Sequence, residues 1–376
     1  MARRRVAVVL LNLGGPDAPE SVRPFLVNLF TDPAILRVPG FIRPWLGRLI
    51  AWRRTKPALA NYMILGGKSP LLELTEEQAR TLEATLAGDT DAEYRAFVCM
   101  RYWHPMSDAV ARAVREWGAE EAVLVPLYPQ YSTTTTGSSL IDWKDATRRA
   151  GLDIPTRTLC CFHSDQGFAA ATARLVREAY DRARAELPEG TGLRLLFSAH
   201  GLPESIVKAG DPYQWQVERS VAAVVAEAGI EGLDHVVCYQ SRVTPQKWIG
   251  PSTEVEIARA GRDKVAILVA PIAFVSEHSE TLVELDVEYR EIAEEDGVPA
   301  YFRVPAQNSD AAFIGALADL VRRTRGRDRS LCSFAGPRQC PKVHGDCPHA
   351  VFRSVPMEPA TPAAAPTPAP AERAAA

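Results

Sequence analysis

The feature that most constrains the fold is a repeated alternation of short apolar runs with amphipathic stretches. Near-continuous apolar strands separated by helical patterns are typical of a parallel sheet that is covered on both faces. The expected strands are Val6–Leu13, Phe97–Tyr102, Ala122–Tyr128, Thr156–Phe162, Arg194–Ser198, His235–Tyr239, Val265–Pro271 and Ala300–Val304. The expected helices are Thr75–Leu86, Asp108–Trp117, Gly167–Glu186, Tyr213–Glu227, Glu280–Glu295 and Ser309–Arg325.

The two halves of this pattern are similarly spaced. Between mid-strand residues the intervals are 90, 27 and 34 residues in the first half, and 41, 31 and 34 in the second. We therefore expect an α/β fold with two similar Rossmann-like (doubly wound) lobes, residues 1–165 and 166–325. The alternative is that spacings near 30 residues are common to any α/β protein.

The first interval is 49 residues longer than its counterpart, which predicts an insertion near residues 30–70. Its sequence LRVPGFIRPWLGRLIAWRR mixes aromatic and aliphatic residues with arginines. One interpretation is a helix packed on the sheet. The other is a hydrophobic flap over a flat apolar ligand, or a lip that contacts a membrane.

Composition excludes several classes. The 43 Lys and Arg against 46 Asp and Glu give a net charge of −3, without the basic stripe of a nucleic-acid binder. No apolar run is long enough to span a membrane and no signal peptide is evident, so we expect a cytoplasmic protein. Residues 326–354 form a cysteine-bearing extension, and the Ala/Pro-rich residues 355–376 are expected to be disordered.

Candidate ligand-binding residues follow the expected strands, because open α/β sheets bind ligands beyond the carboxyl ends of their strands. Neither GxGxxG nor a phosphate-binding GxxxxGK[ST] loop is present, which argues against a sugar-phosphate or nucleotide enzyme. His200 ends the fifth strand, where an imidazole could exchange a proton near neutral pH. The other candidates at strand ends are Leu13, Arg101, Tyr102, Tyr128, Ser132, Glu277 and His278.

An acidic row begins beside the seventh strand. Glu280, Glu284 and Glu288 recur every four residues and so lie on one face of a helix. Unpaired carboxylates repel each other unless a cation or protons relieve them. The row is therefore either a solvated helix face or a path for a divalent cation or protons.

Three cysteines gather near the C-terminus, at Cys332, Cys340 and Cys347. Such thiols bind zinc or an iron–sulfur cluster, and free thiols are the alternative. A fourth ligand could come from Cys160, Cys161, Cys99 or Cys238, or from a terminal histidine, His344 or His349.

Eight segments, taken in order, resemble the ferrochelatase family, whose members insert ferrous iron into protoporphyrin IX. They are LLNLGGPD, GGKSPL, RYWHP, LYPQYSTTTTGSS, FSAHGLP, GDPY, CYQSRV and PIAFVSEHSETLVELDVEY, within about residues 5–325. The resemblance implies a porphyrin cleft between the lobes, with protoporphyrin IX and Fe²⁺ as substrates. It also implies a hydrophobic lip over residues 34–65 that touches the inner face of the membrane.

Residue roles follow from the same resemblance. His200 and Glu280 match the essential pair that face each other across the cleft. Glu277, His278, Glu284 and Glu288 match a metal and proton relay along a locally widened helix. The resemblance also implies porphyrin contacts at Arg101 and Tyr102 and a [2Fe–2S] extension at Cys332, Cys340 and Cys347. We further predict porphyrin contacts at Leu13, Tyr128 and Ser132, and a fourth cluster ligand from Cys160 or Cys161. Because neighbouring residues of a strand point to opposite faces, at most one of these two cysteines can serve.

The sequence departs from the family at four places. Leu13 stands where animal members place a methionine beside the macrocycle, and the internal fourth cluster ligand of animal members falls near Thr133. Met63-Ile64 stands where some animal members have an arginine for a porphyrin propionate, and the cysteine spacing differs from that of animal members. The alternative functions are a coproporphyrin III ferrochelatase and a non-catalytic tetrapyrrole or metal carrier. Zinc at the C-terminal cysteines is the alternative to the cluster. The oligomeric state stays open.

Overall fold

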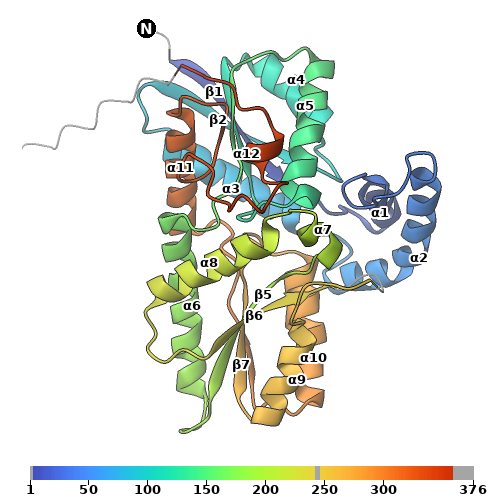
Figure 1. The fold of residues 1–376 in the computed structure, drawn as a ribbon, viewed down its shortest axis with the longest axis vertical. Coiled ribbons are helices and arrows are strands. Elements are labelled where there is room, and N and C mark those ends of the chain that lie inside the picture. The colour runs from blue at the N-terminus through green and yellow to red at the C-terminus, as the bar shows by residue number, and fades with distance from the viewer. Residues whose placement is uncertain (1–2, 242–245, 359–376) are drawn as a thin grey trace, which may run out of the picture.

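The structure is a computed structural model that describes residues 3–241 and 246–358, and it contains two parallel sheets one above the other (Figure 1). In the first sheet the strands pair in the order β2-β1-β3-β4-β9. Their bounds are β1 (Arg4–Asn12), β2 (Ala92–Met100), β3 (Glu121–Pro126), β4 (Thr156–Leu159) and β9 (Leu331–Cys332). The second sheet has the order β6-β5-β7-β8, with β5 (Leu193–His200), β6 (His235–Gln240), β7 (Ala266–Pro271) and β8 (Tyr301–Arg303).

This architecture confirms the predicted fold class, and all eight expected strands are present. In each sheet the first strand lies between the next two strands of the chain, β1 between β2 and β3 and β5 between β6 and β7. The winding therefore reverses at β1 and at β5, and such switch points open a crevice at the carboxyl ends of the strands.

Helices cover both faces of the first sheet. Successive residues of a strand point to opposite faces, so Val6, Val8 and Leu10 of β1 contact one helix pair, while Ala7, Val9 and Leu11 contact the other. The first pair is α3 (Leu71–Leu86) and α11 (Ala311–Arg325), and the second is α4 (Ser107–Trp117) and α5 (Ser138–Ala150). The chain thus returns to the first sheet through α11 and β9, and the lobe boundary near residue 165 stays a prediction.

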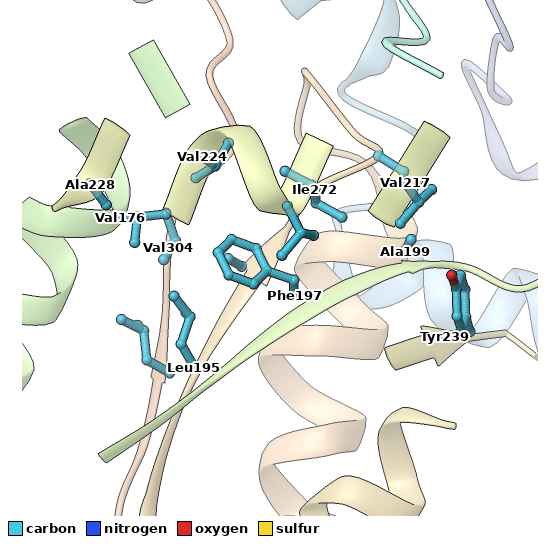
Figure 2. Close-up of a cluster of buried hydrophobic side chains, with 14 of the residues drawn as sticks. Val176, Leu195, Phe197, Ala199, Val217, Val224, Ala228, Tyr239, Ile272 and Val304 are labelled. Carbon is cyan, nitrogen blue, oxygen red and sulfur yellow. The ribbon is translucent and has the colours of Figure 1, made fainter. Parts of the chain in front are cut away.

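The second sheet is covered in the same way. Phe197 of β5 lies among Val176, Val224, Ile272 and Val304 in an apolar cluster formed with α6 (Gln166–Glu186) and α8 (Tyr213–Ala228) (Figure 2). The other face packs on α9 (Thr253–Asp263), on the π-helix η3 (Glu280–Glu288) and on α10 (Tyr289–Glu295). The expected helix 280–295 therefore begins as a widened helix, as the resemblance implies.

The predicted insertion contains α2 (Arg43–Ile64), which lies beside the preceding helix α1 (Val22–Thr31) at one side of the first sheet (Figure 1). They pack on each other through Phe25, Leu26 and Ala51. We call residues 34–65 the lip, and α1 and α2 together the lip helices.

The remaining short elements are η1 (Pro19–Ser21), η2 (Thr133–Gly137), α7 (Glu204–Lys208) and α12 (Pro348–Val351). No helix in the described ranges combines the length and apolarity needed to cross a bilayer. Residues 359–376 of the predicted disordered tail, and Arg242-Val243 of the CYQSRV segment, lie outside the described residues.

Candidate active site

A cavity of about 400 Å³ lies beyond the carboxyl ends of β1, β3, β5 and β7, where both switch points open. Apolar and aromatic side chains from both lobes and from the lip form most of its wall. Such a volume and lining are typical of a small-molecule site. Of the predicted porphyrin contacts, Leu13, Tyr128 and Ser132 line this central cavity.

His200, Glu280 and His278 meet at the wall of the central cavity. The His200 Nδ1 and Glu280 Oε2 atoms are 3.0 Å apart, and the His278 Nε2 atom lies 3.8 Å from the same oxygen. His200 is the last residue of β5, and Glu280 begins the π-helix that follows β7. Because β5 and β7 are neighbours in the sheet, their carboxyl ends bring the predicted pair into hydrogen-bond contact.

Each member of the pair stabilises the charged form of the other. Burial disfavours the imidazolium, but the Glu280 carboxylate outweighs it and raises the pKa of His200 above its ordinary value. Burial also opposes ionisation of Glu280, but His200 and then His278 hold the pKa of that carboxyl well below its usual range. The pair therefore favours an imidazolium beside a carboxylate more strongly than burial alone would allow.

The acidic row continues along η3 away from this pair. Glu284 accepts hydrogen bonds from Gln240 Nε2 at 2.8 Å, Ser241 Oγ at 2.5 Å and Tyr289 Oη at 3.1 Å. Burial and then the charge of Glu280 raise the pKa of Glu284 above its ordinary value.

Glu288, the last member of the acidic row, is exposed and accepts a hydrogen bond from Asn61 Nδ2 of the lip at 3.1 Å. The row therefore runs from the central cavity to the surface.

Glu277 has a different environment from the row. One of its carboxylate oxygens accepts from Arg303 Nη1 at 2.8 Å and from the Ala306 backbone N–H at 2.9 Å. Burial opposes its ionisation, but Arg303 nevertheless lowers the pKa of Glu277. Glu277 does not line the central cavity, and its place in a relay stays a prediction.

Arg101 and Tyr102 also do not line the central cavity. Arg101 Nη2 and Tyr102 Oη donate to Asp32 Oδ2 at 2.7 and 2.8 Å, and Ser138 Oγ donates to the same oxygen. Asp32 caps the end of α1. The pair therefore anchors the base of the lip helices, and its contact with porphyrin stays a prediction.

Other residues at the site were not singled out from the sequence. Arg54 of α2 lines the central cavity, together with Trp248 and Phe274. The sequence shows Arg54 only as one of several basic residues of the insertion, because the irregular apolar pattern does not tell which side of the helix faces the cavity. Gln240 and Ser241 belong to the CYQSRV segment, and their position at the carboxyl end of β6 is the signal that identifies them.

The five cysteines of the predicted cluster are all buried. The sulfurs of Cys160 and Cys161 are 3.6 Å apart, so the expectation that they point to opposite faces is wrong. The reason is that β4 ends at Leu159, and strand alternation does not extend to these two residues. Cys340 and Cys347 form a second close pair, in which a hydrogen bond from Cys340 lowers the pKa of Cys347 to about 7.

These thiols do not form a complete ligand set as placed. Cys332 lies in β9, with its sulfur 3.6 Å from the Thr158 carbonyl oxygen, and Cys340 accepts from Gln216 Nε2 at 3.1 Å. Within residues 3–241 and 246–358, no three His, Cys, Asp or Glu side chains are grouped closely enough to hold a metal ion. We therefore derive no catalytic step through a resident metal.

Comparison with known proteins gives a consistent result. The family model described as ferrochelatase matches residues 5–325. A ferrochelatase of Phenylobacterium zucineum is 53% identical over 344 residues, which is 91% of this chain and 97% of that protein. A ferrochelatase of Caulobacter vibrioides is 51% identical over 346 residues, covering 92% and 97%.

Among solved structures, SirB from Bacillus subtilis with Fe³⁺ aligns with a TM-score of 0.51 at 11% sequence identity. The alignment covers 85% of this chain and 95% of SirB. At that identity the likeness concerns the two-lobed fold alone.

Proposed function

The chain belongs to the ferrochelatase family, and on that premise we propose that it inserts Fe²⁺ into protoporphyrin IX with release of two protons, a step of heme biosynthesis. One observation carries the proposal. The hydrogen-bonded pair of His200 and Glu280 faces an apolar cavity between two lobes, and an acidic row leads from that pair to the surface.

The reaction needs a base and a way to expose the pyrrole nitrogens. A free-base porphyrin is flat and its two N–H groups are weakly acidic, so both protons must leave as the metal enters. Contacts between the apolar wall and the rim of the macrocycle can distort the ring toward the transition state. His200 in its neutral form accepts a proton at the ring face, and Glu280 stabilises the imidazolium that results.

Glu284 and Glu288 provide oxygen ligands along which Fe²⁺ or the released protons pass between solvent and the ring. The raised pKa of Glu284, caused by burial and by Glu280, suits proton transfer at this position. His278 stands beside Glu280 and completes the donor set at the inner end of the row.

The test is metal insertion by a His200→Ala variant. We expect insertion to be lost while protoporphyrin still binds, because the apolar wall is unchanged. His235→Ala is the matched control, since His235 is an exposed histidine on the neighbouring strand β6. Wild-type activity in the His200 variant would refute the assignment, and protoporphyrin binding without insertion by the natural chain would favour a carrier. Assaying coproporphyrin III beside protoporphyrin IX decides between the two substrates.

We also propose peripheral membrane contact through the lip, at the inner face of the membrane. Phe41 and Trp45 are 79% and 77% exposed, and Trp52 is 61% exposed, beside Arg48 and Arg53. Exposed aromatics next to basic residues suit an anionic lipid surface. Co-sedimentation with anionic vesicles should fall in a Trp45→Ser/Trp52→Ser variant and not in Ile141→Ser, an exposed apolar control. If the Trp45→Ser/Trp52→Ser variant sediments with the vesicles as well as the Ile141→Ser variant does, membrane contact through the lip is refuted.

We propose that the buried thiols hold a [2Fe–2S] cluster, with zinc as the alternative. The gathering of two close thiol pairs, Cys160 with Cys161 and Cys340 with Cys347, supports a metal appendage outside the catalytic cavity. Iron and acid-labile sulfide in the purified protein, with visible absorbance, would support the cluster. Zinc without sulfide would reject it in favour of the alternative.

A further inference from the structure

Arg303 bridges two acidic side chains of the segment that carries the acidic row, Glu277 before Glu280 and Asp286 before Glu288. Its Nη1 atom lies 2.8 Å from Glu277 Oε1, and its Nε atom lies 2.5 Å from Asp286 Oδ1. The side chains of Arg303 and Glu277 are 13% and 11% exposed, so the bridge is largely removed from solvent. Glu277 precedes η3 and Asp286 lies within it, so one guanidinium on β8 contacts both ends of this segment.

This bridge divides the carboxylates of residues 277–288 into two groups. Glu277 and Asp286 are paired with a cation. Within the described ranges, Glu284 and Glu288 have no ion pair with Lys or Arg, and Glu280 is paired only with histidines. Five carboxylates so close together would repel one another, and Arg303 neutralises the two that do not belong to the row.

The bridge also fixes the backbone that carries the catalytic pair. The Glu277 carboxylate accepts from the Ala306 N–H at 2.9 Å, and the Glu277 N–H donates to Asn308 Oδ1 at 2.9 Å. The next residue, His278, contacts Glu280. A planar guanidinium can hold two carboxylates at once, whereas an ammonium is a point charge.

We propose that Arg303 is a positioning residue for metal insertion, which holds Glu277 and Asp286 so that only Glu280, Glu284 and Glu288 receive the metal. This inference rests on the function proposed above. Without Arg303, Glu277 and Asp286 lose the cation that holds them, so the backbone before His278 and the carboxylates of η3 are no longer fixed.

The experiment compares Arg303→Met with Arg194→Met. Arg194 is a matched control because it lies in the same sheet, is equally buried and bridges Asp234 and Asp263 at 2.8 and 2.9 Å. It sits at the opposite end of β5 from His200. Fe²⁺ insertion kinetics under anaerobic conditions, protoporphyrin affinity, and Zn²⁺ binding by calorimetry without porphyrin are measured for both.

We expect Arg303→Met to lower kcat/KM for Fe²⁺ and the affinity for Zn²⁺ by about 10- to 100-fold, the usual cost of losing a residue that orients metal ligands. Protoporphyrin affinity should stay unchanged, and Arg194→Met should match the natural chain in both metal measurements. Arg303→Lys keeps the charge but cannot hold two carboxylates at once, so its losses in kcat/KM and Zn²⁺ affinity should be intermediate. This variant replaces Arg303→Met in the test if the Met variant does not fold.

Unchanged metal kinetics and Zn²⁺ affinity in the Arg303 variants, or an equal loss in Arg194→Met, would overturn the inference. The Zn²⁺ measurement distinguishes a wrong role for Arg303 from a wrong proposed function, because it does not depend on iron insertion. If the natural chain inserts no iron, the function fails, whereas the comparison of Zn²⁺ affinities still decides the role of Arg303.

Discussion

The His200 Nδ1 atom lies 3.0 Å from the Glu280 Oε2 atom, although the two residues are 80 positions apart in the chain. The contact arises because β5 and β7 are neighbours and both residues follow the carboxyl ends of these strands. The imidazole is thereby held with a carboxylate on one nitrogen, which favours its protonated form. The strength of the base at this site is therefore set by Glu280.

The pH dependence of insertion should report this contact. His200 accepts a proton only when it is neutral, so kcat/KM should rise with pH through its raised pKa, above the ordinary value of about 6.5. Glu280→Gln removes the main charge that raises the pKa of His200, whereas burial and the charge of Glu284 remain. The rise of kcat/KM should therefore move to lower pH, and the maximal rate should fall. Glu291→Gln, an exposed acid on α10, is the control. A rise at the same pH in both variants would contradict the coupling.

The same pair has a limited pH window for stabilising the fold. Glu280, whose pKa is lowered, contributes stability above its unfolded value of about 4.3 and loses it as the pH falls. His200, whose pKa is raised, contributes below its unfolded value and loses it as the pH rises through the folded one. The pair is thus most stabilising at mildly acidic pH, where insertion is slowed by protonation of the base.

The catalytic pair could be predicted from the sequence, because the apolar runs locate the strands and a parallel sheet brings the carboxyl ends of its strands together. His200 and Glu280 each follow an apolar run, and the carboxyl ends of parallel strands meet. Arg303 was not found in this way, since its partners depend on which side of β8 faces η3. The strand β9 was missed because two residues, Leu331 and Cys332, carry no periodicity.

The sequence also did not reveal Asp32, on which Arg101 and Tyr102 converge. The resemblance placed Arg101 and Tyr102 at the porphyrin, whereas their hydrogen bonds are directed at the end of α1. Side-chain direction after a strand is set by tertiary contacts, which no spacing encodes.

Removing Asp32 should destabilise the protein. Asp32→Ala leaves the half-buried Arg101 guanidinium without its closest partner, with Asp142 Oδ1 at 3.9 Å as the remaining carboxylate. Breaking a buried ion pair on one side typically costs about 3–5 kcal/mol. We expect a loss near the lower end of that range in urea denaturation. Asp145→Ala, which breaks an exposed pair with Arg148, should cost less than about 1 kcal/mol, and equal losses in the two variants would contradict this account.

Arg54 should recognise the carboxylates of the substrate. Among the described residues that line the central cavity, Arg54 is the basic side chain other than the histidines. A hydrogen-bonded ion pair with a propionate contributes about 1.5–3 kcal/mol, so Arg54→Ala should raise KM for protoporphyrin by roughly 10-fold or more. The dimethyl ester of the same porphyrin should be affected little. Arg53→Ala, the exposed neighbour, is the control, and an equal effect of Arg54→Ala on the ester would contradict a carboxylate contact.

Gly47 allows the two lip helices to approach closely. A Cβ atom at this position of α2 would lie 2.6 Å from the Phe30 carbonyl oxygen and 2.8 Å from Thr31 Cγ2, both in α1. Gly47→Ala should therefore push α2 away from α1, at a cost of about 1–3 kcal/mol by overpacking. Gly40→Ala is a matched control, because nothing lies within 4 Å of the added atom. Since Ile50 and Arg54 of α2 line the central cavity, the Gly47 variant should also bind protoporphyrin more weakly in fluorescence titrations. Unchanged binding in a destabilised Gly47→Ala protein would show that the cavity does not depend on the position of α2.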